Sequence, residues 1–272
     1  MKKLLMATAA SALMAGGAFA EDVKIGIVLG FTGPLESITP AMAAGAELAM
    51  KEVTDSGKFM DGSAVVPVRA DSTCIDSAAA TAAAERLVTS DGVAGIMGAD
   101  CSGVTGAILQ HVARPNGVVM VSPSATSPGL STAEDDGLFF RTSPSDARQG
   151  VIVTNILQDR GVKEIAITYT NNDYGKGLAD AIETEFKAAG GTVTIASAHE
   201  DGKADYSAEV GALASAGGEV LVVAGYVDQG GSGVVRSALD TGAFDTFYFP
   251  DGMVGVKLNE NFGAELNGSY GT

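Results

Sequence analysis

The stretch VAGIMGADCSGVTGAILQHVA, residues Val93–Ala113, decides the fold that we expect for this chain. Its first six residues form a short apolar run that is typical of a buried strand, and Val104–Ala113 has the apolar spacing of a helix. Between them lies the polar loop ADCSG, in which Ser102 directly follows Cys101. A strand, a short loop and a helix make up the first part of a β-α-β unit.

The same unit recurs on both sides of this stretch. Further strands are expected over Val23–Leu29, Val65–Ala70 and Val118–Ser122 and then over Glu164–Tyr169, Thr192–Ala196, Glu219–Val223 and Phe247–Phe249. Helical patterns separate them, over Pro40–Val53, Ser77–Thr89, Ala147–Gln158, Leu178–Ala189, Tyr206–Ala214 and Val234–Leu239. This alternation predicts an α/β fold with mostly parallel sheets, arranged as two Rossmann-like lobes with a ligand cleft between them. The extended segment Phe139–Pro144 places the boundary, with lobes over 21–143 and 144–272.

The first twenty residues have the pattern of a secretory signal peptide. Lys2 and Lys3 precede an apolar run from Leu4, and Ala18-Phe19-Ala20 is an A-x-A cleavage site. No later stretch has the roughly eighteen unbroken apolar residues that a membrane-spanning helix needs. We therefore expect a soluble chain that is exported to a bacterial periplasm.

Charge and cysteine content exclude several classes of protein. The formal net charge is −16, which repels phosphate backbones and argues against a nucleic-acid partner. In an oxidising compartment, Cys74 and Cys101, the only two cysteines, are expected to form a disulfide. Two histidines without ligand-like spacing predict no metal site. Neither G-x-G-x-x-G nor G-x-x-x-x-G-K-[ST] occurs, so no nucleotide cofactor is expected.

The loops that follow the strands carry the candidate site, because ligands gather beyond the carboxyl ends of parallel strands. In the first lobe, Ser102 is expected to cap a helix, and Thr126-Ser127-Pro128 reads as a second cap followed by proline at the first helical position. Two helix starts on neighbouring strands suit a small carboxylate. In the second lobe the loops offer Tyr174, Tyr226 and the anionic Asp251. One wall for an anion and one for a cation predict a zwitterion, that is, an amino acid.

Several of these segments together resemble a known family. The export signal, the cysteine pair, SPSATSPGL (Ser122–Leu130), DYGKG (Asp173–Gly177) and the later GY and PDG are similar to periplasmic substrate-binding proteins of branched-chain amino-acid ABC transporters, which are type I periplasmic binding proteins. The resemblance runs from about Val23 to the end of the chain. Members are usually longer and return to the first lobe, so the chain resembles a C-terminally truncated member.

The resemblance implies a role for each candidate residue. Ser102 would bind the ligand carboxylate through its hydroxyl and backbone N–H, Thr126 would act similarly, and the carbonyl of Ser124 would accept from the ammonium. Asp251 would pair with that ammonium, and Asp146 matches an acid at the pocket edge. Tyr174 and Tyr226 would line the opposing wall.

The function implied by the family is capture rather than chemistry. A monomer would close on an amino acid, branched-chain ones being favoured, and deliver it to an inner-membrane ABC permease, with no enzymatic activity. Two alternatives stay open: a periplasmic sensor of amides or amino acids on the same fold, and a periplasmic hydrolase with Ser102 as nucleophile. The residues also have plain structural readings, Ser102 as a cap alone, Tyr174 as a turn residue and Asp251 as a turn former.

Overall fold

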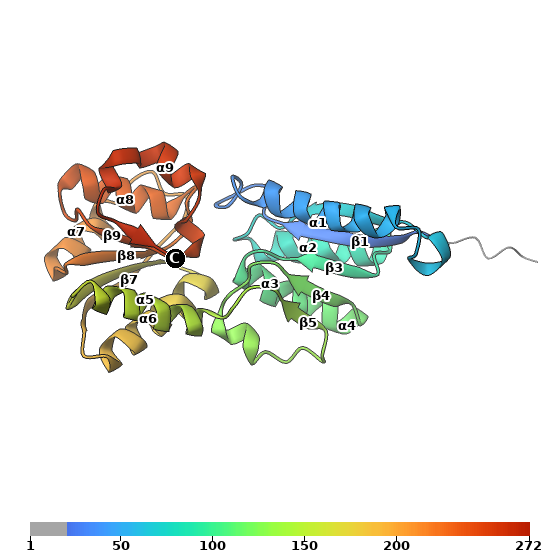
Figure 1. The fold of residues 1–272 in the computed structure, drawn as a ribbon, viewed down its shortest axis with the longest axis horizontal. Coiled ribbons are helices and arrows are strands. Elements are labelled where there is room, and N and C mark those ends of the chain that lie inside the picture. Colours follow the sequence, from blue (N-terminus) through green and yellow to red (C-terminus); the bar gives the residue numbers. More distant parts are fainter. Residues whose placement is uncertain (1–20) are drawn as a thin grey trace, which may run out of the picture.

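The computed structural model describes residues 21–272, which form two α/β lobes side by side (Figure 1). The signal peptide expected over residues 1–20 lies outside the described residues. Each lobe contains a parallel sheet, with strand order β2-β1-β3-β4-β5 in the first lobe and β10-β9-β8-β6-β7 in the second. The predicted α/β class with two mostly parallel sheets is confirmed.

The first lobe alternates strands and helices around β1, which is buried on both faces towards its carboxyl end. Ile27 and Leu29 pack against one helix, whereas Val28 packs into the cluster on the opposite face. The elements are β1 (Val23–Leu29), α1 (Thr39–Asp55), η1 (Met60–Gly62), β2 (Val65–Asp71), α2 (Ser77–Arg86), η2 (Leu87–Asp91), β3 (Gly95–Gly98), α3 (Ser102–Ile108), η3 (Leu109–Ala113), α4 (Arg114–Asn116), β4 (Val119–Ser122), η4 (Pro128–Ser131) and β5 (Phe139–Arg141). The helices α3, η3 and α4 form one unbroken helical run.

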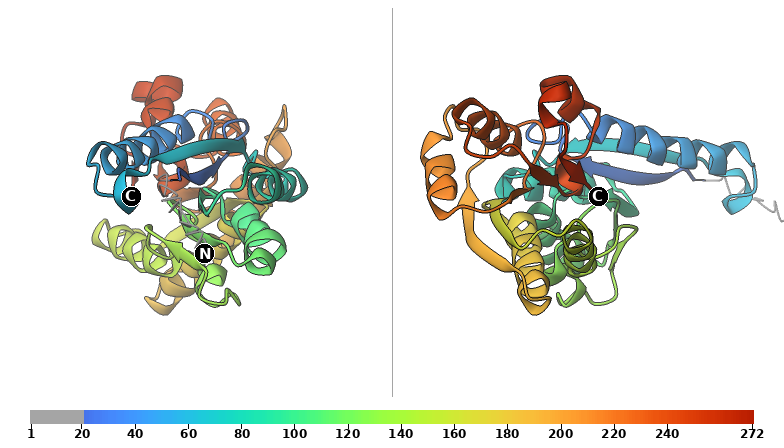
Figure 2. Two further views of the ribbon diagram at one scale, coloured as in Figure 1. Left: turned by 90° about the vertical axis from the view of Figure 1, so that its right-hand side faces the viewer. Right: turned by 60° about the vertical axis from the view of Figure 1, so that its left-hand side comes forward.

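The second lobe repeats this plan with helices on both sides of its sheet. Helices α5 and α6 cover one face, and α7 and α8 cover the other (Figures 1 and 2). Alternate residues of β6 separate the two faces, because Ile165 and Ile167 pack into one buried cluster and Ala166 into another. The elements are α5 (Asp146–Asp159), β6 (Glu164–Thr170), α6 (Asp173–Ala188), β7 (Thr192–His199), α7 (Ser207–Ala216), β8 (Val220–Ala224), α8 (Gly230–Thr241), β9 (Phe247–Phe249), η5 (Asp251–Met253), α9 (Val256–Phe262), η6 (Gly263–Leu266) and β10 (Tyr270–Gly271).

Some element boundaries differ from the predicted ones for identifiable reasons. Helix α6 begins at Asp173, five residues before the expected Leu178, because the Asn172 side chain caps it by accepting from the N–H of Gly175 at 3.0 Å. Phe139–Arg141 is not free crossing chain but the edge strand β5, paired with β4. Helix α9 was not expected at all.

The chain passes between the sheets once within the described residues, between Arg141 and Asp146. The lobe boundary after residue 143 falls in this passage, and the division into 21–143 and 144–272 stays a prediction. One buried apolar cluster contains residues of both lobes, among them Leu130 of the first and Leu178 of the second. No helix in residues 21–272 combines the length and apolar character that crossing a bilayer demands.

Candidate functional site

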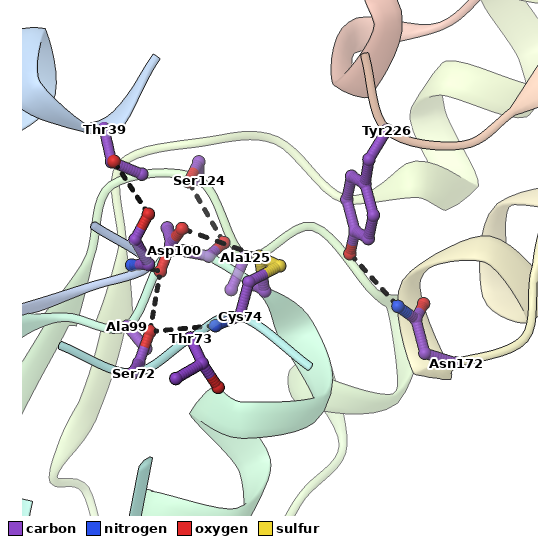
Figure 3. The surroundings of a disulfide bond; sticks show 12 residues. Thr39, Ser72, Thr73, Cys74, Ala99, Asp100, Ser124, Ala125, Asn172 and Tyr226 are labelled. Carbon is purple, nitrogen blue, oxygen red and sulfur yellow. Dashed lines mark hydrogen bonds between the residues drawn. A yellow bond between two sulfur atoms is a disulfide. The ribbon is translucent and has the colours of Figure 1, made fainter. Parts of the chain in front are cut away.

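The disulfide between Cys74 and Cys101 organises the first wall of the site. It joins the loop after β2 to the start of α3, with the two Cα atoms 5.2 Å apart. Beside it, the buried carboxylate of Asp100 accepts from the N–H of Gly30 at 3.0 Å and from the hydroxyl of Ser72 at 3.3 Å (Figure 3). Burial raises the pKa of Asp100 to about 6. The carboxyl ends of β1, β2 and β3 are therefore fixed to one another.

Ser102 lies one position further into its helix than predicted. Cys101 occupies the N-cap with an extended backbone, and Ser102 is the first helical residue. Its hydroxyl accepts from the N–H of Ser127 at 3.1 Å, so the predicted cap role of Ser102 is wrong. The first N–H groups of a helical run have no acceptor within the helix, and Ser102 contributes one of them.

The second predicted helix start is also weaker than expected. Pro128 does begin a helical turn, but η4 is a 3-10 turn of four residues with Ser127 at the N-cap, and neither Thr126 nor Ser127 makes a capping bond. A single turn has little aligned dipole to offer an anion. The Thr126 hydroxyl is instead buried without a hydrogen-bond partner among the described residues.

The facing wall comes from the second lobe. The hydroxyl of Tyr174 donates to Asp251 Oδ1 at 2.9 Å and accepts from the N–H of Gly252 at 3.2 Å. Tyr226 stacks on Tyr174 with ring centroids 5.2 Å apart, and its hydroxyl accepts from Asn172 at 3.3 Å. Burial raises the pKa of both tyrosines, which keeps their hydroxyls protonated.

The carboxyl groups of Asp146 and Asp251 lie close together, with Asp251 in this wall and Asp146 buried beneath it. Asp146 is completely buried, and its backbone N–H donates to the carbonyl of Thr126 at 2.9 Å. The expected position of Asp146 at the pocket edge is therefore wrong, because that bond draws the start of α5 under the Thr126 loop. With its amide oriented to satisfy its neighbours, Gln149 donates to Asp146 Oδ1 at 3.1 Å and to Asp251 Oδ1 at 3.2 Å.

The environment of this pair favours a cation. Burial, and next the negative charge of Asp251, raise the pKa of Asp146 to about 8. Asp251 has exposed surface and lines the cavities described below, yet the surrounding protein excludes enough water to raise its pKa as well. Among residues 21–272, neither carboxylate takes part in an ion pair. The positive charge of Arg141 lowers the pKa of Asp146 only slightly against these effects, and a ligand ammonium beside Asp251 would add a further positive charge.

A cavity of about 200 Å³ lies between the two walls. The predicted residues that line it are Ser102, Ser124, Tyr174, Tyr226 and Asp251. Thr126 lines an adjoining cavity of about 330 Å³, which shares Ser124 and Asp251 with the first. The structure therefore brings the predicted residues to one region between the lobes, with Asp146 beneath it.

Sequence reasoning missed several residues of this region. Asp100 also lines the smaller cavity, although it directly precedes the disulfide cysteine in the loop that opened the argument. The apolar lining of Leu35, Ile38, Met42 and Val254 was missed too. Ile38 and Met42 stand four residues apart at the beginning of α1, a helical spacing that could have pointed to one face.

No metal-binding role is supported by the described part of the chain. The single group of candidate ligands there comprises Cys74, Asp100 and Cys101, and disulfide sulfurs are not the thiolates that bind metal ions.

Comparison with known proteins adds the family relationship. The sequence profile described as periplasmic binding protein matches residues 22–272. The chain is 29% identical over 267 residues to the Leu/Ile/Val-binding protein of Citrobacter freundii, covering 98% of this chain and 71% of that protein. It is 30% identical over 275 residues to the Leu/Ile/Val-binding protein homolog 1 of Brucella melitensis, covering 100% and 72%.

Among solved structures, one similar protein is the branched-chain amino acid transporter substrate-binding protein LivJ of Streptococcus pneumoniae in complex with isoleucine. The TM-score is 0.79 and the identity 26%, over 92% of this chain and 70% of that one.

Proposed function

This chain belongs to the periplasmic binding protein family, and from this membership we propose that it is an extracytoplasmic receptor that captures an amino acid between its lobes, with branched-chain amino acids favoured. The observation that carries the proposal is the cavity between the lobes, where Ser102 at a helix start faces Asp251 and Tyr174. The names of the relatives support it, since they are described as Leu/Ile/Val-binding proteins.

The two walls would divide the work of holding a zwitterion. The ligand carboxylate would accept from the hydroxyl and N–H of Ser102, with the unpartnered hydroxyl of Thr126 reaching it from the adjoining cavity. The ammonium would lie against Asp251 and the carbonyl of Ser124. Both charged groups would then exchange water for charge-assisted hydrogen bonds, which are the strongest kind available here.

The apolar lining supports an aliphatic side chain. Leu35, Ile38 and Met42 come from the first lobe and Val254 from the second. Burying a branched hydrocarbon side chain between them would contribute about 25 cal/mol of favourable free energy for each Å² of apolar surface removed from water. Because this lining has residues from both lobes, such a ligand would stabilise the state in which the lobes are together.

The remaining parts of the proposal concern the cellular role. A cleaved signal over residues 1–20 would export the chain, and the monomer would pass its ligand to an inner-membrane ABC permease. Ligand chemistry is not part of this role. Within the described residues, the Ser102 hydroxyl accepts a hydrogen bond from the backbone N–H of Ser127, and His199 Nδ1 is hydrogen-bonded to the Thr168 hydroxyl rather than to the serine.

Isothermal titration calorimetry tests the proposal directly. The protein is titrated with the twenty amino acids and with small amides and aliphatic acids lacking an ammonium. We expect saturable binding of leucine, isoleucine or valine and weaker binding of 4-methylpentanoate, the leucine analogue without its amino group. Binding of non-amino ligands alone would contradict the proposed ammonium site, and turnover of any ligand would favour a hydrolase.

A further inference from the structure

Two hydrogen bonds join the lobes next to Leu35, Ile38 and Tyr226, which line the smaller cavity. The Asp228 carboxylate accepts from the backbone N–H of Ser37 at 2.9 Å, and the N–H of Asp228 donates to the carbonyl of Pro34 at 3.3 Å. Asp228 lies in the second lobe, between β8 and α8, whereas Pro34 and Ser37 lie before α1 in the first. None of the three lines the cavity.

The first-lobe side of this contact is firmly held. Gly33 has a φ of +102°, and a Cβ there would lie 2.5 Å from the carbonyl oxygen of Thr73, so the turn sits directly on the segment that leads into the disulfide. The hydroxyl of Thr32 donates to Asp71 at 2.6 Å, which fastens the turn to the end of β2. The acceptor and donor offered to Asp228 therefore have fixed positions.

The second-lobe side is connected to the ligand wall. Asp228 stands two residues after Tyr226, and the N–H of the intervening Val227 donates to the carbonyl of Gly252 at 3.1 Å, next to Asp251. The Asp228 carboxylate makes no other hydrogen bond or ion pair within residues 21–272. Its bond to Ser37 thus connects the wall that carries Tyr226 and Asp251 to the opposite lobe. The carboxylate makes no hydrogen bond within the described part of its own lobe.

We propose that Asp228 is a positioning residue for ligand capture: its bonds to Pro34 and Ser37 latch the lobes together and set how long a ligand is held. The inference rests on the proposed function, since it concerns the lifetime of the captured ligand. The latch forms only when the lobes meet, so it stabilises the closed state without touching the ligand. Losing it therefore speeds release and leaves the encounter between ligand and open protein unchanged.

The test compares three variants by stopped-flow or surface plasmon resonance with L-leucine as the probe. Asp228→Ala removes the acceptor, Asp228→Asn keeps an oxygen that can accept from Ser37, and Asp245→Ala is the control. Asp245 is an exposed aspartate of the same lobe that precedes the amino end of β9, whereas the cavity residue Asp251 follows the carboxyl end of that strand. Removing it changes net charge equally.

We expect Asp228→Ala to raise the leucine dissociation rate roughly 5- to 30-fold. This is the effect of losing a hydrogen bond to a charged acceptor that is weakened by partial exposure to water. The association rate does not fall, because the open form that meets the ligand is at least as abundant in the variant as in the wild type. Asp228→Asn recovers most of the loss, and Asp245→Ala behaves as wild type. An unchanged dissociation rate in Asp228→Ala overturns the latch and leaves the proposed function intact.

If wild-type protein binds no leucine, the failure lies with the proposed function for that ligand. In that case, small-angle X-ray scattering of the ligand-free proteins tests whether Asp228 holds the lobes together. A larger radius of gyration for Asp228→Ala than for wild type and Asp245→Ala supports it. Equal radii overturn it.

Discussion

Replacing Asp251 with asparagine separates the charge of this residue from its hydrogen bond. An asparagine oxygen can still accept from the Tyr174 hydroxyl, which lies 2.9 Å from Oδ1, so the wall keeps its shape. What disappears is the negative charge that we expect to meet the ligand ammonium. Truncating one partner of a desolvated charge pair costs about 2–5 kcal/mol.

The structure places the expected loss towards the lower end of that range. Asp251 has exposed surface towards both cavities, so water weakens its interaction with the ammonium, and the neighbouring Asp146, whose pKa is raised to about 8, can ionise and supply a negative charge in its place. We expect Asp251→Asn to weaken the binding of leucine by about 2–3 kcal/mol, which raises Kd roughly 30- to 150-fold. Calorimetry measures both proteins, with Asp245→Asn as a variant of equal charge change.

A second ligand makes the reasoning refutable. 4-Methylpentanoate has the carboxylate and side chain of leucine but no ammonium, so Asp251→Asn should leave its affinity unchanged or improve it by removing repulsion. Equal weakening of both ligands would mean that the substitution disturbs the cavity as a whole. An undiminished affinity for leucine would remove Asp251 from the ammonium site.

Three further predictions concern pH and the disulfide. Burial and the charge of Asp251 raise the pKa of Asp146 to about 8, and a bound ammonium favours the ionised form of this carboxyl, so leucine affinity should increase as pH rises towards 8 and level off above it. Calorimetry in buffers of different ionisation enthalpy should detect proton release on binding, which Asp146→Asn should reduce, and equal proton release in the variant would contradict this. Burial lowers the pKa of His199 from 6.5 to about 4, so the neutral form of this histidine contributes about 3 kcal/mol of stability above pH 6.5, which is lost as the pH falls to 4. Urea unfolding should therefore show that the free energy of unfolding falls less steeply between pH 6.5 and 4 in His199→Gln than in wild type. An equally steep fall in both proteins would contradict this. The double variant Cys74→Ser/Cys101→Ser should lose about 3–4 kcal/mol of the free energy of unfolding in urea and should also bind leucine more weakly by calorimetry. A loss of stability with unchanged leucine affinity would show that the disulfide does not hold the Ser102 loop in its binding position.

The order of elements was predictable because strands and helices of this fold have strong, separate patterns. β9 was placed at Phe247–Phe249, and the loops after the strands did meet between the lobes. Helix boundaries were less predictable because side chains outside the apolar pattern decide them. The cap of Asn172 extends α6 backwards and places Tyr174 inside the helix, where it points to Asp251.

The parts of the site that could not be predicted depend on contacts between distant segments. The role of Ser102 changed because Cys101, held in its bridge, takes the N-cap and Ser127 supplies a donor. Asp146 was placed too near the surface because nothing in its own segment announces the bond to Thr126. Gln149, which joins two carboxylates from different elements, has no sequence signature of any kind.

The covalent bridge beside Asp100 makes the two halves of the receptor unequal. On one side, three strand ends are tied by a bond and a buried acid. On the other, the tyrosines and Asp251 are held by hydrogen bonds and stacking alone. Substitutions in the second half can therefore shift the positions of Tyr174, Tyr226 and Asp251 more easily than substitutions in the first half can shift Ser102, so we expect differences in ligand preference between relatives to arise mainly from the second half.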